Sequence, residues 1–402
     1  MTDATVLPPR FDALDPGVLE DPYPTYARLR AAAALCRGGP GAWVAPRYAE
    51  VAALLRDRRL GSEFPAEYHD LSGGAGAASE FMRAIILYRD PPEHERLRRL
   101  MGHAFAGAAM RALAADVRGL VDRLLEPCAE RGRFDVVADL ALPLPVMVVC
   151  RLMGIPASDH TTIRPHALAL GRAFAAIVPG EARAGADAAV AWLRDYLAAA
   201  LDERRRRPGD DLLTRMLAAQ DGEDRLTPEE IVDNAVFAFF AGFETTTNLI
   251  GNGVGALLHH PGELERLLAS PALVAPAVEE FLRFDAPIQG VARFVREPVE
   301  VAGRTLRAGR VLVLLVGSAN RDERAFERAD ELVLDREPNR HLSFGGGVHY
   351  CLGAPLSRIE ARATFAALRE RFASLEPDGP PLRHADTSFR AYARLPVTVR
   401  PR

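Results

Sequence analysis

The sequence predicts a mainly α-helical protein with a minor β part, and three observations lead to this fold class. Apolar residues recur at helical spacing in four segments, at 27–35, 96–125, 190–205 and 358–372. A fifth segment, between Thr227 and His260, has the pattern of one long apolar helix. Strand-like runs are few and short, and they lie at 291–301, 305–306, 311–316 and 394–399.

The long helix is predicted to begin at a capping box. Thr227 is followed by Pro228 at the first helical position and then by Glu230, whose carboxylate can return a hydrogen bond to the Thr227 backbone. The pattern then continues without proline as far as Pro261. About 31 residues at ~1.5 Å rise per residue give a rod of roughly 46 Å. Its first half is apolar nearly all round, so we expect a buried central helix.

Composition fits a globular chain with an ample core. The 402 residues are 49% apolar and 26% charged, and the 54 acidic and 50 basic residues give a formal net charge of -4. This balance gives no reason to expect a nucleic-acid partner. The four cysteines, Cys36, Cys128, Cys150 and Cys351, are too few for a disulfide framework and indicate reduced thiols.

No targeting or spanning segment is expected. Residues 1–9 lack the basic and apolar regions of a signal peptide. The most apolar run, 142–153, contains two prolines and Arg151 and falls short of the roughly 18–20 residues that cross a bilayer. The sequence therefore predicts a cytoplasmic protein. No linker divides it, so a single domain over residues 1–402 is expected, with the glycine-rich stretch 72–79 as a surface loop or a lid.

The strongest chemical signal is a glycine loop around Cys351. Residues 343–353 read S-F-G-G-G-V-H-Y-C-L-G, and a helical pattern follows. Three consecutive glycines let the backbone turn tightly against a flat or bulky group. A cysteine at the start of a helix is placed where backbone N–H groups favour a thiolate. Such a thiolate suits an axial metal ligand or a nucleophile; the nucleophile needs a histidine base, and His349 is only two residues away.

Residues 344–353 resemble the haem-binding loop of the cytochrome P450 family, F-G-x-G-x-H-x-C-x-G. The resemblance implies the P450 fold, a triangular helical domain with a long central helix and small β-sheets. It also implies haem b as the cofactor, Cys351 as the proximal iron ligand, and Phe344, Gly345 and Gly353 as loop residues around the cofactor. A thiolate ligand favours O–O bond cleavage, so the implied chemistry is oxygen activation.

The long helix carries a second resemblance to the same family. Ala241-Gly242-Phe243-Glu244-Thr245 is similar to its A-G-x-[DE]-T motif. The resemblance implies that Gly242 leaves room for dioxygen, that Thr245 hydrogen-bonds an oxygen intermediate, and that Glu244 delivers protons from solvent. The alternative is a buried threonine that bonds back to its own helix.

Two more motifs match in the family's order. Residues 90–98 resemble D-P-P-x-H-x-x-x-R, which places His94 and Arg98 on one helical face. With Arg293 and His349 they are implied to bind the haem propionates. Glu280 and Arg283 resemble E-x-x-R, a buried pair whose third partner is best matched by Arg336, with a structural role.

The partners follow from the resemblance. The sequence ends about fifty residues after the ligand with no flavin or iron–sulfur module, so we expect no fused reductase and electrons from a ferredoxin and its reductase. Dioxygen and a small molecule are the expected substrates, and a monomer is expected. Arginines near the cysteine loop are candidates for steering the ferredoxin, or else form a solvated face; they are Arg98, Arg99, Arg358 and Arg362.

The substrate is the least determined part. Phe237, Phe240 and Ala241 are expected to share the face of Thr245 and to line a pocket with Gln289, Gly290 and Phe389. The phenylalanines favour a medium-to-large apolar substrate, and a bacterial enzyme of this family commonly tailors a secondary metabolite. Three hypotheses stay open: hydroxylation or epoxidation with O2; a peroxide-driven or non-hydroxylating oxidation such as C–C coupling, cyclisation or rearrangement; and a haem-thiolate sensor without turnover.

Overall fold

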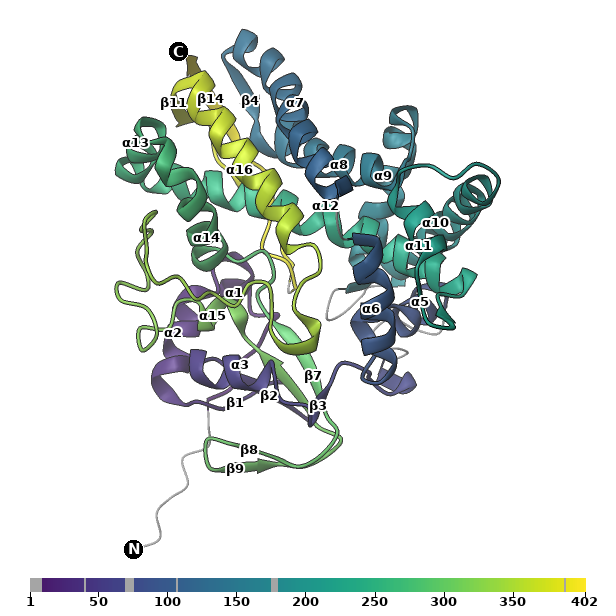
Figure 1. The fold of residues 1–402 in the computed structure, drawn as a ribbon. Coiled ribbons are helices and arrows are strands. Elements are labelled where there is room, and N and C mark those ends of the chain that lie inside the picture. Colours follow the sequence, from purple (N-terminus) through teal and green to yellow (C-terminus); the bar gives the residue numbers. More distant parts are fainter. Residues whose placement is uncertain (1–8, 40, 69–75, 106–107, 175–179, 387) are drawn as a thin grey trace, which may run out of the picture.

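Helices make up most of the chain, as the apolar periodicity predicts (Figure 1). The structure is a computed structural model that describes residues 9–402 except 40, 69–75, 106–107, 175–179 and 387. The helices are α1 Pro16–Glu20, α2 Tyr23–Ala32, α3 Tyr48–Leu54, α5 Ala77–Ala84, α6 Glu93–Phe105, α7 Ala108–Arg131, α8 Pro143–Met153, α9 His160–Gly171, α10 Gly180–Arg206, α11 Leu212–Ala218, α12 Pro228–His259, α13 Pro261–Ala269, α14 Val274–Phe284, α15 Val316–Ala319 and α16 Ala354–Arg371.

The predicted long helix is α12, and it crosses the middle of the molecule (Figure 1). The capping box is present: the Thr227 hydroxyl accepts a hydrogen bond from Glu230 N, and the Glu230 carboxylate accepts one from Thr227 N. Helices α8, α10, α14 and α16 all pack against α12. The helix is therefore the central rod that the apolar pattern predicts, because hydrophobic side chains on nearly every face need a neighbour to cover them.

Two segments, one predicted as a helix and one as a loop, differ from the prediction. The pattern at 96–125 is two helices, α6 and α7, because α6 turns to contact α11 while α7 packs on α16. The stretch predicted as a loop at 72–79 is partly helical, since α5 begins at Ala77; residues 72–75 lie outside the described residues.

The apolar run before α8 is longer than the sequence suggested. A π-helical turn, Val136–Ala141, leads directly into α8, and the combined segment Val136–Met153 reaches the length and hydropathy of a membrane span. Two thirds of it is buried inside the protein, where it packs against α7 and α12. We interpret it as a core helix, so the expectation that no run reaches spanning length was wrong while the packing explains its composition.

Short strands form small sheets beside the helices. They are β1 Cys36–Arg37, β2 Ala42–Ala45, β3 Leu60–Gly61, β4 Arg133–Asp135, β5 Gln220–Asp221, β6 Asp224–Arg225, β7 Val291–Val295, β8 Val299–Val301, β9 Arg304–Leu306, β10 Val311–Leu314, β11 Phe372–Pro377, β12 Leu382–Arg383, β13 Tyr392–Arg394 and β14 Pro396–Pro401. The largest sheet has the order β1-β2-β10-β7-β3, and a second has the order β11-β14-β4.

The strand predictions were right in place and wrong in extent. The run 291–301 is two strands, β7 and β8, that belong to different sheets, and β10 ends at Leu314 because α15 follows. The run 394–399 is divided between β13 and β14. The two-residue strands β1, β3, β5, β6 and β12 were not predicted, because so few residues carry no periodicity.

The cysteine loop lies where the helical part meets the five-stranded sheet. Figure 1 shows the segment before α16 beside α6 and above β7, with α12 behind it. The helical core and the core of the sheet are separate clusters of buried side chains. The predicted site residues on α6, α12, β7 and the α16 loop therefore converge on the boundary between the two cores.

Candidate functional site

The backbone holds Cys351 at the entry to α16. The Cys351 N–H donates to the Phe344 carbonyl at 3.0 Å, which closes the glycine loop into a ring. Gly353 is the N-cap of α16. Cys351 is exposed, whereas Cys36, Cys128 and Cys150 are buried. The only exposed thiol in the described part of the chain is therefore the one that the sequence selects.

Two glycines of the loop are required by geometry. Gly345 and Gly347 have φ values of +72° and +65°, in the left-handed region that favours glycine. At Gly347 a Cβ atom would lie 2.7 Å from the Leu55 carbonyl oxygen. The loop can therefore lie this close to the segment after α3 only with glycine at that position.

The surroundings of the Cys351 sulfur act in opposite directions on its charge. Although one side of the residue is open, the protein atoms around the sulfur desolvate it, and this raises the pKa of the Cys351 thiol. The backbone N–H groups of Gly353 and Ala354 and the guanidinium groups of Arg98 and Arg358 favour the thiolate and lower the pKa. Desolvation outweighs them and raises the pKa overall, although the start of the helix favours the thiolate as expected. A bound metal ion is what removes the proton from a thiol in such surroundings.

Four basic side chains gather near this loop, as predicted. The rings of His94 on α6 and His349 on the loop lie 4.1 Å apart. Burial lowers the pKa of His94, and burial together with His94, Arg293 and Arg98 lowers the pKa of His349 to about 3. Burial also lowers the pKa values of Arg98 and Arg293, and among the described residues neither arginine has an ion pair.

This basic cluster fits an anionic group. The Nδ1 atom of His94 is buried and has no hydrogen-bond partner in the described part of the chain. Such an orphaned polar atom is costly unless a ligand satisfies it. Two carboxylates, such as the haem propionates, would pair with Arg98 and Arg293 and would accept hydrogen bonds from the histidines. The residues present therefore fit haem, and Cys351 would bind its iron.

A buried ion-pair network holds the loop from behind. Arg283 and Glu280 on α14 are fully buried and form a bidentate pair at 2.8 Å. Arg336 joins Glu280 at 3.1 Å, so the predicted third partner is in place. Arg283 also donates to the Asn320 carbonyl, and the Asn320 side chain bonds Leu342 N and the Ser343 hydroxyl. The network thus ends on the first residues of the cysteine loop.

On α12, the predicted acid Glu244 and the predicted alcohol Thr245 are adjacent in sequence but make different contacts. The Thr245 hydroxyl donates to the Ala241 carbonyl at 2.9 Å, which is the back-bond expected of a threonine buried in its own helix. The Glu244 carboxylate accepts from the Asn248 amide at 3.3 Å. Burial raises the pKa of Glu244, and the negative charge of Asp386 raises it further. Glu244 is therefore poised to hold a proton closer to neutral pH than an ordinary glutamate.

Gly242 has a packing role that the motif did not predict. A Cβ atom at this position would lie 2.7 Å from Val149 of α8, so the missing side chain faces the packing contact between α12 and α8. Gly242 lets these two helices approach closely. The expected space for dioxygen at Gly242 stays a prediction.

Aromatic side chains form one wall on the part of α12 that precedes Thr245. Phe240 of α12 stacks on Phe174 with ring centroids 4.7 Å apart, and Phe389 meets Phe240 edge to face at 6.1 Å. Phe237 lies 6.4 Å from Phe174. Phe237, Phe240 and Phe389 therefore come together as predicted, and Phe174 completes the group.

Gln289 and Gly290 follow a residue that borders this wall. Ile288 forms a β-bridge with Phe389, and the Gln289 N–H donates to the Ser388 carbonyl at 3.3 Å. The Gln289 amide donates to the Ala286 carbonyl and to the Tyr23 hydroxyl, and its side chain faces Gly317. A Cβ atom on Gly290 would lie 3.3 Å from the Leu314 carbonyl oxygen. The assignment of the two residues to the substrate pocket stays a prediction.

The arginines around the loop are largely paired. Arg358 and Arg362 bond Glu279 at 2.8 and 3.3 Å, and Arg358 also lies over the Phe344 ring at 4.4 Å. Arg99 pairs with Asp221 and Asp224. Only Arg98 of the four lacks an ion pair among the described residues, and its place beside Cys351 suits the propionate role better than a steering role.

Sequence reasoning missed three residues of the site. Phe174 has no motif around it, and only its ring contact with Phe240 reveals it. Asp386 comes from a turn far along the chain, and only the tertiary fold brings it to Glu244. Asn248 could have been found, since it follows Glu244 by four residues on a helix that was correctly predicted.

Comparison with known proteins gives one consistent result. The family model described as Cytochrome P450 matches residues 59–270 and 271–395. Nocardicin C N-oxygenase of Nocardia uniformis subsp. tsuyamanensis is 38% identical over 96% of this chain and 97% of its own length. Cytochrome P450 monooxygenase PikC of Streptomyces venezuelae is 35% identical over 98% of this chain and 96% of its own.

The same likeness holds in three dimensions. The crystal structure of CalO2 superposes with a TM-score of 0.92 at 39% sequence identity, covering 98% of this chain and 99% of that one. Sequence motifs, fold and the arrangement around Cys351 therefore agree. The chain belongs to the cytochrome P450 family of haem-containing monooxygenases.

Proposed function

We propose that this P450 uses O2 to hydroxylate or epoxidise a medium-to-large apolar small molecule and that it tailors a bacterial secondary metabolite in the cytoplasm. The observation that carries the proposal is the Glu244–Thr245 pair on α12, beside an aromatic wall. An acid next to an alcohol serves an enzyme that must deliver protons to reduced oxygen. Peroxide-driven chemistry has no comparable need for a proton supply.

Haem supplies the oxygen activation when bound, and the chain supplies its binding groups. Cys351 would bind the iron, and His94, Arg98, Arg293 and His349 would hold the two carboxylates. The loop from Phe344 to Cys351 would hold the thiolate in place, with Gly345 allowing the close turn and Gly353 capping the helix that follows. The Glu280–Arg283–Arg336 network would keep that loop in register.

Thr245 and Glu244 would handle the protons. Burial raises the pKa of Glu244, which favours its protonated form. Thr245 now donates to its own helix, and rotation of the hydroxyl about χ1 would let it donate toward the centre of the site instead. The peptide carbonyl of Ala241 then becomes free to accept from water.

The aromatic wall favours an apolar substrate. Phe174, Phe237, Phe240 and Phe389 provide a large apolar contact area with few torsions to order. The nocardicin and PikC relatives are named for oxygenation in bacteria, and this supports the class of metabolite by analogy alone. We propose a ferredoxin and its reductase as the electron donors.

The test is isotope incorporation with a bound substrate. A panel of apolar natural products is screened by the shift of the haem absorption, and the tightest binder is incubated with 18-oxygen gas and a ferredoxin system. One labelled oxygen atom in the product is expected. Unlabelled product, or product formed equally well with peroxide and no reductant, would favour coupling, cyclisation or rearrangement instead.

A variant of Thr245 separates its role in proton delivery from the binding of haem and substrate. In Thr245→Ala the haem and substrate shift should be retained, while a larger share of the reducing equivalents appears as hydrogen peroxide. Thr247→Ala is the matched control, because it removes a hydroxyl from the same helix at a buried position. Equal peroxide yields in the two variants would remove Thr245 from the relay.

A further inference from the structure

A buried carboxylate, that of Asp285, joins segments that lie far apart in the sequence. Asp285 follows the last residue of α14 and is 5% exposed. Its Oδ1 atom accepts from the Tyr23 hydroxyl of α2 at 2.7 Å and from Arg390 Nε at 3.1 Å. Its Oδ2 atom accepts from Arg383 of β12 at 2.8 Å. Both carboxylate oxygens are therefore used, and the motifs identified in the sequence include none of these residues.

Asp285 carries a negative charge at neutral pH. Burial raises the pKa of this carboxyl group, but the positive charges of Arg383, Arg390 and Arg321 outweigh the burial, and the pKa lies below its ordinary value. The guanidinium groups of Arg383 and Arg390 are themselves largely buried. Loss of the Asp285 charge would therefore leave them without their compensating partner.

Arg390 is held both at its backbone and at its side chain. Its N–H donates to the Pro287 carbonyl at 2.8 Å, and its carbonyl accepts from the Asn252 amide at 2.8 Å. Its guanidinium donates to Asp285 and, at 2.9 Å, to the carbonyl of Glu20 at the end of α1. Arg390 therefore ties its segment to α12, to the end of α14 and to the end of α1.

Phe389 is the neighbour of Arg390 in the chain and belongs to the aromatic wall. Phe389 pairs with Ile288 in a β-bridge, and its ring meets Phe240 edge to face at 6.1 Å. The ring keeps this contact only while the bridge and the bonds of Arg390 hold the backbone. Asp285 is thus connected, through one arginine, to the surface that the proposed function assigns to the substrate.

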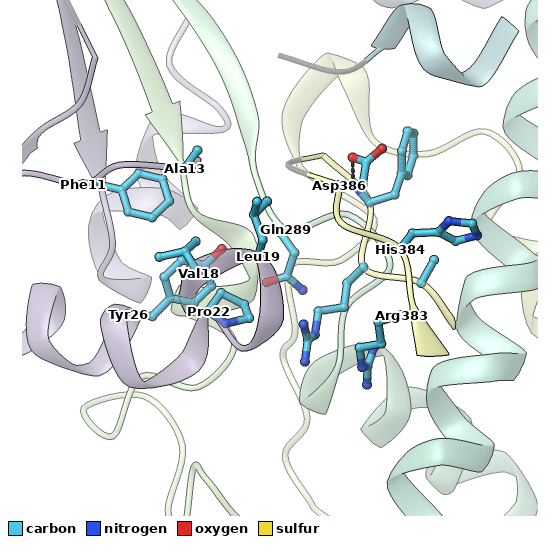
Figure 2. Close-up of a pocket in the computed structure, with 13 residues that line it drawn as sticks. Phe11, Ala13, Val18, Leu19, Pro22, Tyr26, Gln289, Arg383, His384 and Asp386 are labelled. Atoms are coloured by element: carbon cyan, nitrogen blue, oxygen red, sulfur yellow. Dashed lines mark hydrogen bonds between the residues drawn. The ribbon is translucent and has the colours of Figure 1, made fainter. Parts of the chain in front are cut away.

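Packing alone does not fix this end of the aromatic wall. Phe389 and Arg390 border a cavity of about 30 Å³ that is also lined by residues near the N-terminus. Figure 2 shows Tyr26, from the N-terminal segment, across this cavity from Arg383. Space that side chains leave unfilled provides no van der Waals contact to resist a shift of the chain. The hydrogen bonds to Asp285 therefore carry more of the task of holding the segment here.

We propose that Asp285 is a positioning residue for substrate binding, which places Phe389 in the aromatic wall through Arg390. Asp285 does not touch the substrate; it sets the position of a residue that does. The Tyr23 hydroxyl extends the same anchor to α2. The inference rests on the proposed function, because it takes the aromatic wall as the surface that contacts the substrate.

The test compares a large and a small ligand of the haem iron in the haem-loaded enzyme. Clotrimazole and imidazole both bind iron through an azole nitrogen, but only clotrimazole carries further aromatic rings. Each is titrated by the shift of the haem absorption, and the readout is the dissociation constant of clotrimazole divided by that of imidazole. In Asp285→Asn we expect this ratio to rise about fivefold, the scale of one lost aromatic contact. A general loss of stability would not change the ratio.

A double-mutant cycle tests whether Asp285 acts through Phe389. Phe389→Ala should raise the ratio at least as much as Asp285→Asn does. The double variant should show no further rise, because the two changes remove the same contact. Additive effects, or an unchanged ratio in Asp285→Asn, would overturn the positioning role.

A second variant breaks the same link from its other side. Arg390→Met keeps the length of the side chain but removes the donors to Asp285 and to the Glu20 carbonyl. It should raise the ratio as Asp285→Asn does, and it decides the question if Asp285→Asn does not fold. A wild-type ratio in Arg390→Met would overturn the proposal.

Asp211→Asn is the matched control. Asp211 is another buried aspartate that an arginine holds, with Arg204 Nε at 2.8 Å, but it caps α11, which contributes no residue to the aromatic wall. Its ratio should equal that of wild type. Without any azole, hydrogen exchange of the Arg390 amide should become faster in Asp285→Asn and stay unchanged in Asp211→Asn. Unchanged exchange in Asp285→Asn would also contradict the role, since Arg390 would then be fixed without the carboxylate.

The two proposals fail in different ways. If Phe389→Ala raises the ratio and Asp285→Asn does not, the positioning role is wrong and the aromatic wall stands as the substrate surface. If Phe389→Ala leaves the ratio unchanged, the wall does not contact the bound ligand and both assignments fall. Unlabelled product in the isotope experiment, with the ratio raised in both variants, would remove the proposed reaction and leave the role of Asp285 intact.

Discussion

The loop that carries Cys351 and the aromatic wall on α12 are built by different means. The loop is one stretch of sequence, closed by the Cys351 N–H to Phe344 carbonyl bond and shaped by Gly345 and Gly347. The wall is assembled from α12, the residues after α9 and the turn before β13, which meet through ring contacts. Local hydrogen bonds fix the first arrangement, and tertiary packing fixes the second.

This difference separates the chemistry of the cofactor from the choice of substrate. A ligand loop locked by its own backbone and by buried ion pairs tolerates little change. Rings in contact at the ends of separate segments can be replaced by other apolar groups at modest cost. We therefore expect changes on the Cys351 side to remove the cofactor's signature and changes on the wall to retune binding.

The largest effect should come from the ligand itself. Cys351→Ala removes the sulfur, so the reduced protein with carbon monoxide should lose the thiolate-type absorption band completely. Circular dichroism would serve as the control, since the helices do not depend on one exposed thiol. Persistence of the band in this variant would refute Cys351 as the ligand.

The second largest effect should come from breaking the buried ion pair of Arg283 and Glu280, which lies behind the cysteine loop. Arg283→Met leaves the Glu280 charge with less compensation and removes the donor from the carbonyls of Asn320 and Ala329. Breaking a buried ion pair costs about 3–5 kcal/mol, measured as the free energy of unfolding in urea. Arg205→Ala breaks an exposed pair with Asp202 at the same helical spacing and should cost under ~1 kcal/mol. Equal losses in the two variants would contradict the role of burial.

Glycine geometry in the loop can be tested against a matched glycine. Gly303 has a φ of +77°, and a Cβ placed there would meet no atom of the described residues within 4 Å, whereas Gly347 has a φ of +65° and the Leu55 carbonyl at 2.7 Å. Gly303→Ala should cost about 1–2 kcal/mol of unfolding free energy for the backbone conformation alone. Gly347→Ala should cost more and should also reduce haem content. If the two variants lose the same free energy of unfolding, the close approach of Gly347 to Leu55 makes no difference to the cost of the substitution.

The same contrast explains what the sequence could and could not predict. The capping box of α12 and the loop around Cys351 are local patterns, and both are present as predicted. Gly242 shows the limit of a motif: its letters matched, but only packing reveals that its missing side chain faces Val149. The hydrogen bond between Gln289 and Tyr23 joins two segments that no local pattern connects. Phe174 and Asp386 reach the site only through tertiary contacts, which no local pattern encodes.

The smallest effect should come from a change in the aromatic wall, where we expect altered substrate affinity without loss of the carbon monoxide band. Phe240→Leu keeps an apolar side chain but removes the stacked contact with Phe174 and the edge contact with Phe389. An aromatic pair contributes about 0.5–1.5 kcal/mol beyond its buried area, so the dissociation constant of a bound substrate should change by roughly tenfold or less. The measurement is a titration of the haem absorption, with the carbon monoxide band as the control for an intact Cys351 side. Loss of that band in Phe240→Leu would mean that the two sides are coupled, and the separation argued from their construction would be wrong.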